Sequence, residues 1–152
     1  MKKTPLITGW REWAALPELG VENIKVKVDT GAKTSSIHAF DIMPFTRDGK
    51  EWVQFEIHPL QDQDRLTRTC TSPIVDYRWI TSSMGSSQLR YIIRTTLTIG
   101  RFSAQIDLSL ANRDEMGFRM LVGRDALSGT ILVDPNRSFL LTSDPTTKGK
   151  TA

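Results

Sequence analysis

Cysteine is nearly absent from this sequence, because Cys70 is the only one among 152 residues. A single cysteine can form no internal disulfide, and a chain without disulfides suits a reducing compartment. The first residues, Met1 to Pro5, carry two lysines, but the apolar stretch behind them is too short for a signal peptide. We therefore expect a cytoplasmic protein that is stabilised by its hydrophobic core.

Long apolar runs and blocks of basic residues are also missing. No run is long enough to cross a membrane, so we expect no membrane partner. The net charge is only +3 at pH 7, with the basic residues scattered along the chain. This distribution argues against nucleic acid as the main partner, although it suits an acidic one. Hydrophobic residues at 39% and charged residues at 24% indicate a folded globular domain.

Histidine is scarce, with His38 and His58 as the only two. There is no His-Glu-x-x-His motif and no cysteine pair, so the sequence gives weak support for a zinc site. The remaining possibility is a site made by both histidines, Cys70 and a carboxylate, and we expect no metal. No glycine-rich loop could bind a phosphate, so no nucleotide cofactor is expected either.

Alternation of apolar and polar residues is what the sequence does contain. In residues 24–28 two valines and an isoleucine share one face of a strand, and two lysines share the other. Further β-type runs, with turn signals between them, cover 35–43, 52–57, 66–70, 74–80, 89–99 and 102–110, and Asp48-Gly49 predicts a hairpin turn before 52–57. Residues 6–19 are expected to form an entry strand and an apolar lid on the core. Many short strands predict an all-β, closed, barrel-like domain over residues 1–143. The polar residues 144–152 are expected to form a disordered tail.

Two hairpins are predicted in the second half of the chain. The β-type runs at 74–80 and 89–99 flank a small, polar stretch at 82–87, which favours a long hairpin with a flexible tip. The apolar runs at 131–133 and 139–141 flank an Asp-Pro-Asn-Arg turn, which favours a shorter hairpin.

An acidic residue follows the strand that ends at Val28, in the motif Asp29-Thr30-Gly31. A carboxylate at the end of a half-buried strand is held rigidly, and a glycine beside it leaves room for the backbone of a ligand. The same three residue types also end strands without any chemistry, since all are common in turns. A second motif far downstream, Met120-Leu121-Val122-Gly123-Arg124-Asp125, favours the chemical interpretation.

Together the two motifs resemble those of the retropepsin-like aspartic peptidases, whose subunits carry one Asp-Thr/Ser-Gly and a later apolar-apolar-Gly-Arg. Residues 9–12, 28–39, 90–93 and 112–116 are more closely similar to the bacterial RimB-like family labelled "ATP-dependent zinc protease". The similarity spans roughly residues 7–142. It implies a closed all-β barrel with one short helix after the Gly-Arg motif. It also implies that the hairpin around residues 82–87 is a flap that folds over substrate.

The resemblance implies peptide hydrolysis by a pair of carboxylates. Two acids about 3 Å apart share one proton, so that one can act as a base towards water and the other as an acid. This chain has one Asp-Thr-Gly, so a two-fold homodimer must bring Asp29 against its own copy. Thr30 would then join the two loops by hydrogen bonds, and Gly31 would admit the substrate backbone.

The other aspartates are expected to be structural. Asp107 alternates with the apolar face of its strand and should be exposed, whereas Asp114 and Asp134 stand in loops or turns. Asp125 should cap the short helix. Arg124 is expected to be an internal guanidinium with a bidentate acceptor, and it forms a structural motif with Gly123 and Asp125.

Residues of the Asp29 loop and the flap are expected to contact substrate: Ala32, Lys33, Arg78, Met84, Gly85 and Arg90. Many viral retropepsins carry an aspartate where this chain has Lys33, and that acid pairs with the arginine of the Gly-Arg motif. Lys33 removes this acceptor and places a cation beside the cleft, and Arg94 adds to the positive charge near the flap. The resembled family is associated with ligases that add glutamates to a ribosomal protein. These features favour an acidic peptide or a glutamate tail as substrate.

Two other functions stay open at this stage. The domain could keep the fold as a catalytically silent module that binds an acidic tail or a protein partner. It could also be a metallopeptidase, which would require stoichiometric zinc.

Overall fold

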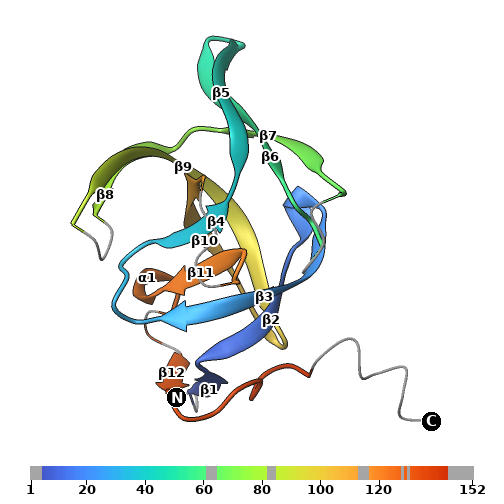
Figure 1. The fold of residues 1–152 in the computed structure, drawn as a ribbon, viewed down its shortest axis with the longest axis vertical. Helices are drawn as coiled ribbons and strands as arrows, with labels where there is room; N and C mark the ends of the chain where they lie inside the picture. The colour runs from blue at the N-terminus through green and yellow to red at the C-terminus, as the bar shows by residue number, and fades with distance from the viewer. Residues whose placement is uncertain are drawn as a thin grey trace.

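Strands make up nearly all of the regular structure in the computed structural model, which describes residues 5–60, 65–81, 85–112, 117–127, 129 and 131–143 (Figure 1). The strands are β1 (Leu6–Gly9), β2 (Arg11–Leu16), β3 (Val21–Asp29), β4 (Ser35–His38), β5 (Phe40–Arg47), β6 (Lys50–Ile57), β7 (Arg68–Pro73), β8 (Asp76–Thr81), β9 (Ser87–Ile99), β10 (Phe102–Ala111), β11 (Met120–Gly123) and β12 (Ile131–Asp134). A 3₁₀ turn, η1 (Pro17–Leu19), follows β2.

The main sheet closes into a barrel. Strand β10 pairs in parallel with β4 on one side and antiparallel with β9 on the other, so that the ring β10–β4–β11–β3–β2–β9 returns to its start. Closure leaves no free edge within that ring. The prediction of an all-β, barrel-like fold is confirmed.

The barrel interior is filled by the alternating apolar residues of its strands. Ile24, Val26 and Val28 are all buried, as predicted, and Lys25 and Lys27 lie on the other face of β3. Burying a side chain of this size stabilises the fold by about 1.5–3 kcal/mol. Other strands contribute Leu16, Ile93, Leu97, Ile99, Leu108, Met120 and Val122 to the same core.

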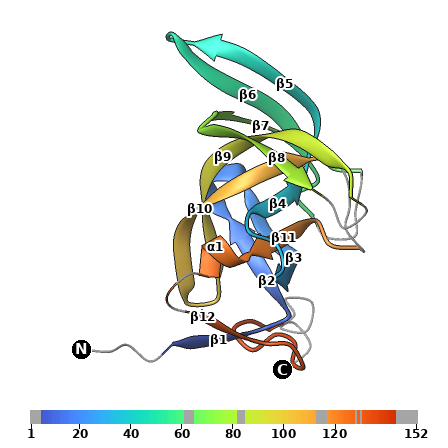
Figure 2. The same cartoon turned by 90° about the vertical axis from the view of Figure 1, so that its left-hand side faces the viewer.

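Strands β5, β6 and β7 form a second sheet, from which the β5–β6 hairpin projects as an arm (Figures 1 and 2). The other end of this sheet packs on the barrel, since Val53, Phe55 and Ile57 of β6 are buried in the common core. The prediction of one strand over residues 35–43 is wrong, because β4 belongs to the barrel and β5 to the arm. The division falls at Ala39, which is fully buried and whose amide bonds to Ala111 O at 2.9 Å. Asp41, with φ of 50°, lies in a register shift just beyond it. Such a bulge bends a strand without interrupting its β-type composition.

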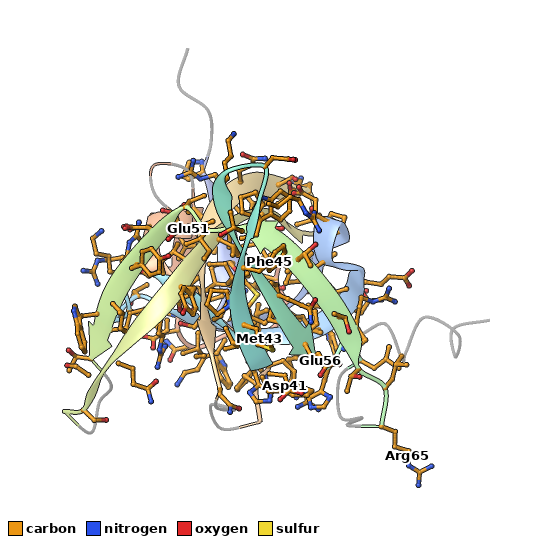
Figure 3. All side chains as sticks on the ribbon, turned by 90° about the horizontal axis from the view of Figure 1, so that it is seen from above. Asp41, Met43, Phe45, Glu51, Glu56 and Arg65 are labelled. Atoms are coloured by element: carbon orange, nitrogen blue, oxygen red, sulfur yellow. The ribbon has the colours of Figure 1, made fainter. Side chains whose placement is uncertain are left out.

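The arm ends in the Asp-Gly turn that the sequence predicted. Asp48 and Gly49 both have positive φ, as this two-residue hairpin turn requires. Met43 and Phe45 lie along β5 in Figure 3, and the Phe45 and Trp52 rings are 6.3 Å apart across the hairpin. The Arg47 guanidinium lies 4.3 Å from the centre of the Trp52 ring.

The long hairpin predicted for residues 74–99 is present as β8 and β9. Its register runs from Asp76 opposite Ile92 to Thr81 opposite Ser87. Among the strands that the structure describes, β8 pairs with β9 alone and is the edge of its sheet. Residues 82–84 of the tip, including Met84, lie outside the described residues.

The C-terminal part differs from the prediction of a hairpin over 131–141. Strand β12 pairs in parallel with β1, and residues 139–141 form no strand. Instead, the amides of Leu140, Leu141 and Thr142 donate to the carboxylate of Glu12. A buried acceptor near the other end of the chain therefore replaces the predicted strand partner. The predicted tail at 144–152 lies outside the described residues.

The only α-helix in the described part of the chain is α1 (Arg124–Leu127), directly after Gly123. This confirms the short helix expected there. Within the same residues, no helix is long and apolar enough to cross a membrane.

Candidate active site

Asp29 is the last residue of β3 and lies opposite Gly123 of β11 in the parallel register. Its Oδ1 accepts the Gly31 amide at 2.9 Å, and its main-chain oxygen accepts the Ala32 amide at 3.2 Å. The carboxylate is thus held by the turn that follows it, at the end of β3, which pairs with β11 on one side and β2 on the other. This is the rigid placement that the sequence predicted.

The backbone of the Gly-Arg motif supports the Asp29 loop. The amide of Arg124 donates to Ala32 O at 2.8 Å, and the amide of Asp125 donates to Lys33 O at 3.1 Å. The Gly123 amide donates to Ser35 Oγ at 3.0 Å. These three bonds join two segments that lie far apart in the sequence.

Glycine is required at position 123 because the loop backbone lies against it. A β-carbon there would be 2.7 Å from the carbonyl carbon of Thr34 and 2.8 Å from Lys33 O. Both are main-chain atoms, so a side chain would push the Asp29 loop away. Gly123 therefore has the structural role that the motif predicted.

The side chain of Arg124 differs from the prediction of an internal guanidinium with a bidentate acceptor. In the single chain it is exposed, and Nη1 lies 3.4 Å from both Thr30 O and Gly31 O. Neutral carbonyl oxygens of the Asp29 loop replace the expected carboxylate. The physical reason is the lysine at position 33, which removes the acid and itself pairs with Asp125.

Lys33 and Asp125 form an ion pair at 3.1 Å on the surface. The prediction that Asp125 caps α1 is wrong, since it lies within the first turn and its carboxylate binds Lys33 instead. Both side chains are more than half exposed, at 67% and 53%. An exposed pair of this kind contributes at most about 1 kcal/mol, so Lys33 can exchange its partner readily.

A cleft of about 410 Å³ separates the Asp29 loop from strand β8. The loop contributes Gly31, Ala32, Lys33 and Thr34, and β8 contributes Arg78, Trp79, Ile80 and Thr81. This volume lies within the range of ligand-binding clefts. The predicted contact residues Ala32, Lys33 and Arg78 therefore lie together. Gly85 is exposed at the described end of the flap tip, with φ of 85°.

Arg90 does not line this cleft, so the structure does not bring it together with Ala32, Lys33 and Arg78. It is buried, and its Nη1 lies 3.4 Å from Ser36 Oγ. With His38 and Arg119 it lines a separate cavity of about 30 Å³. This volume is enough for a water molecule.

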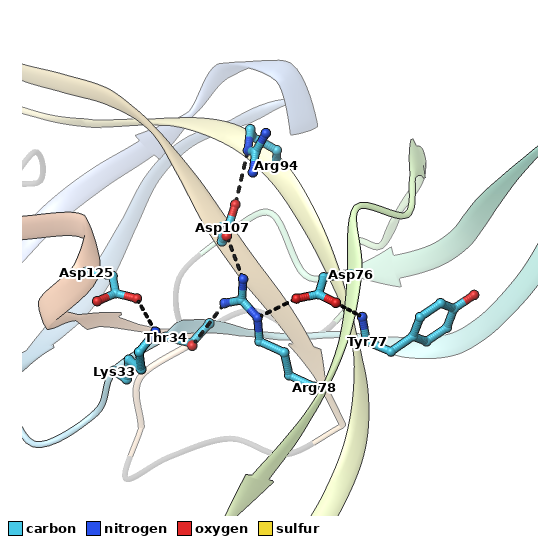
Figure 4. A network of polar contacts seen from close by, with 8 residues as sticks. All are labelled: Lys33, Thr34, Asp76, Tyr77, Arg78, Arg94, Asp107 and Asp125. Atoms are coloured by element: carbon cyan, nitrogen blue, oxygen red, sulfur yellow. Dashed lines mark hydrogen bonds and ion pairs between the residues drawn. The ribbon is translucent and has the colours of Figure 1, made fainter.

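Arg78 is bound on three sides (Figure 4). Its Nη2 donates to Asp107 at 2.8 Å, its Nε to Asp76 at 2.9 Å and its Nη1 to Thr34 Oγ1 at 3.3 Å. Arg94 donates to the other oxygen of Asp107 at 3.1 Å. The prediction that Asp107 is exposed is wrong, because these arginines cover it and leave 26% of its side chain exposed.

The two carboxyl groups of this network favour their charged forms. Burial raises the pKa of Asp107, but hydrogen bonds from Arg78 and Arg94 outweigh burial and lower the pKa below its usual value. The pKa of Asp76 is lowered by its bonds from Arg78 and from the Tyr77 amide. Both acids therefore stay ionised when most carboxyl groups begin to protonate.

Glu12 is the buried acid that our interpretation of the sequence missed. It is fully buried and accepts hydrogen bonds from Thr8, Gly9 and three amides of residues 140–142. The alternation of β2 held a signal, since Glu12 shares its buried face with Ala14 and Leu16. An acid in register with core residues indicates a carboxylate with dedicated donors.

The residues considered for zinc do not converge. The His38 and His58 rings stack with their centres 5.7 Å apart, whereas the Cys70 sulfur faces Leu19 O at 3.7 Å. Burial raises the pKa of the Cys70 thiol, which disfavours the thiolate that a metal needs. The described residues hold no group of three or more His, Cys, Asp or Glu side chains suited to a metal ion. Asp134 is the last residue of β12, not a loop or turn residue as predicted, and its carboxylate accepts the Asn136 amide of the turn that follows at 2.9 Å. Asp114 lies outside the described residues.

A family model described as the retropepsin-like aspartic endopeptidase RimB matches residues 7–144. The chain belongs to the RimB-like family. The matched residues include the Asp29 loop, the β8–β9 hairpin and the Gly-Arg motif. The family predicted from these motifs is thereby confirmed.

Curated relatives of this RimB-like chain carry a different name. A probable alpha-L-glutamate ligase of Shewanella pealeana is 49% identical over 141 residues, which are 93% of this chain and 31% of that protein. One of Desulfotalea psychrophila is 50% identical over 129 residues, or 85% and 28% of the two chains. The chain thus spans less than a third of the relatives' length.

A solved structure shares the fold of this RimB-like chain. It is a Legionella pneumophila protein of unknown function (DUF785), with a TM-score of 0.71 and 24% identity over 90% of this chain and 98% of that one. At this identity the likeness shows the fold alone.

Proposed function

We propose that this RimB-like chain is an aspartic endopeptidase that acts as a homodimer, with Asp29, Thr30 and Gly31 of each copy at the catalytic centre. The observation that carries the proposal is the placement of Asp29. Its carboxylate is held by the Gly31 amide at the end of a paired strand, and the residues that follow, Gly31 to Thr34, line a cleft of about 410 Å³. Family membership supports the same chemistry.

The proposed reaction uses the two Asp29 carboxyl groups as a unit. When a two-fold axis brings them together they hold one proton between them, and the pair titrates as a whole. The ionised member takes a proton from water, and the water oxygen attacks the scissile carbonyl carbon. The protonated member gives its proton to the reacting carbonyl oxygen. The resulting tetrahedral intermediate collapses with proton transfer to the leaving amine.

An acidic peptide, in particular a glutamate tail, is the proposed substrate. Lys33 lines the cleft, is 67% exposed and is held by a weak surface pair, so that a substrate carboxylate can replace Asp125. The net charge of +3 favours the approach of an anionic peptide. Relatives named as glutamate ligases make glutamate chemistry a reasonable context.

The decisive experiment compares the wild-type chain with Asp29→Asn on a peptide that ends in several glutamates. Asp48→Asn is the matched control, since it makes the same change at the tip of the arm, where asparagine also tolerates positive φ. We expect cleavage by the wild type and the control but none by Asp29→Asn, with all three equally stable. Sedimentation should show a dimer under the assay conditions. A monomer that cleaves would contradict the proposal.

A second candidate is a catalytically silent module that binds an acidic tail. The observation that favours it is the occurrence of this domain as less than a third of longer proteins named as probable ligases. The same experiment separates the two functions. A binding module would hold the glutamate peptide equally well before and after Asp29→Asn and would cleave it in neither case.

A further inference from the structure

Apart from its bonds to β9, the flap strand β8 is held over the cleft by side-chain contacts, one of which is the hydrogen bond from the Tyr77 hydroxyl to Glu51 on β6. It is the edge of its sheet among the described strands, and β9 is its only strand partner there. Yet Arg78, Trp79, Ile80 and Thr81 of β8 form one whole wall of the Asp29 cleft. The position of this strand therefore decides the shape of the cleft.

Arg78 joins this strand to two other parts of the molecule. One guanidinium group bonds to Asp107 on β10 at 2.8 Å and to Thr34, directly after the Asp29 loop, at 3.3 Å. A third bond, to Asp76 at 2.9 Å, holds the guanidinium against its own strand. Because the guanidinium is planar and its donors are fixed in a fork, three acceptors in three directions define its orientation.

Asp107 binds an arginine from each of the two strands of the flap hairpin. Arg78 of β8 binds one of its oxygens and Arg94 of β9 binds the other, as Figure 4 shows. The side chains of Arg78 and Asp107 are 29% and 26% exposed. The pair is thus partly shielded from solvent, unlike the exposed pair of Lys33 and Asp125.

The charges within this network balance. Two arginines, Arg78 and Arg94, face two ionised aspartates, Asp76 and Asp107. The negative charges of the two carboxylates that already bind the Arg78 guanidinium oppose the approach of a third carboxylate. This arrangement makes Arg78 a poor choice for recognising an acidic substrate.

We infer that Arg78 is a positioning residue, which fixes the flap strand β8 over the Asp29 cleft by joining it to Asp107 and Thr34. The inference rests on the proposed peptidase function for its effect on catalysis. The inference that Arg78 fixes the position of β8 does not depend on whether the protein is a peptidase. Preference for an acidic substrate then rests on Lys33, the other cation among the described residues that line this cleft, while Arg78 sets the cleft geometry for every substrate.

Hydrogen exchange of the β8 amides tests the fastening without an activity assay. We expect Arg78→Ala and Asp107→Asn each to speed exchange in residues 76–81 by about tenfold or more. The matched control is Arg94→Ala, which also removes an arginine from Asp107 but lies on β9, between two paired strands. It should change β8 exchange much less. Exchange in Arg78→Ala within about twofold of the wild type would overturn the inference.

Kinetics on paired peptides separate positioning from substrate binding. One peptide ends in glutamates and the other in glutamines of the same number. If Arg78 positions β8, Arg78→Ala lowers kcat/KM for both peptides by a similar factor, and Lys33→Gln lowers it for the glutamate peptide alone. If Arg78 binds substrate, Arg78→Ala raises KM for the glutamate peptide only, which would overturn the inference.

Arg78→Lys completes the test because it keeps the positive charge but loses the planar, forked set of guanidinium donors. A lysine cannot reach Asp76, Asp107 and Thr34 together, so β8 exchange should stay fast. Full recovery of slow exchange with lysine would show that charge alone is needed and would overturn the inference. If the wild type cleaves neither peptide, the proposed peptidase function fails, while the exchange results still decide the role of Arg78.

Discussion

The carboxylate of Glu12 accepts the backbone amide of Thr142 at 3.0 Å, across 130 residues of sequence. The same group accepts the amides of Leu140 and Leu141 and the hydroxyl of Thr142. One buried side chain therefore supplies the acceptors that a neighbouring strand would otherwise provide. Together with the backbone bonds from Trp10 N to Arg137 O and from Phe139 N to Arg11 O, this acid holds the segment after β12 against the barrel.

Glu12→Gln should destabilise the protein strongly. The amide keeps the shape but places N–H donors against backbone donors that then lack an acceptor. We expect the free energy of unfolding in urea to fall by about 3 kcal/mol or more. Glu22→Gln, at an exposed position of β3, is the matched control and should change it by less than about 0.5 kcal/mol. A loss below about 1 kcal/mol for Glu12→Gln would refute this account of its role.

Gly123→Ala should abolish most of the proposed activity by displacing the backbone of the Asp29 loop. The new β-carbon would meet the carbonyl carbon of Thr34 at 2.7 Å, so that the Asp29 loop must shift. We expect at least a hundredfold loss of peptide cleavage, on the order of the effect of a 1 Å displacement in an active site. Gly49→Ala at the tip of the arm meets no atom within 4 Å and should cost stability but leave cleavage intact. Normal cleavage by Gly123→Ala would argue against the loop geometry.

Tyr77 should ionise at unusually high pH. Its hydroxyl donates to the Glu51 carboxylate, which raises the pKa of Tyr77 to about 12. The protonated phenol is favoured in the folded state, so its stabilising effect is complete below the ordinary pKa of about 10 and is lost as pH rises through about 12. Absorbance at 295 nm can follow this, since Tyr91 is the only other tyrosine. Glu51→Gln should move the upper transition downwards, and an unchanged curve would contradict the assignment.

Asp107 should make the flap sensitive to acid. Its pKa is lowered in the folded state, so its contribution to stability is complete above the ordinary carboxyl pKa of about 3.9. The contribution declines as pH falls below that value and through the lowered pKa. Unfolding in urea should therefore show a smaller difference between wild type and Asp107→Asn at pH 2.5 than at pH 6. Equal differences at both pH values would show that the charge of Asp107 is not what matters.

The motifs and the strand pattern predicted much of this molecule. Alternation around Val26 and the Asp48-Gly49 turn gave correct strands and a correct hairpin, because both signals are local. The Asp29 loop and the Gly-Arg motif do lie together, opposite each other in β3 and β11. Their roles in catalysis and the homodimer stay predictions.

What the sequence could not show were partners chosen over long distances. The two arginines that cover Asp107 come from other strands, and no local pattern marks an acid as their acceptor. Residues 139–141 have an apolar, strand-like composition, but the acceptors for the amides of residues 140–142 lie on Glu12. Ala39 separates two sheets within one continuous β-type run, because a bulge changes direction without changing composition.

The support of the Asp29 loop also bears on the order of events during synthesis. Ala32 O and Lys33 O are bound by the amides of Arg124 and Asp125, which the ribosome adds much later. A nascent chain that ends before β11 has the acid but lacks the contacts that hold its loop. In the proposed peptidase, the loop that carries the acid therefore gains its support only after translation has passed both motifs.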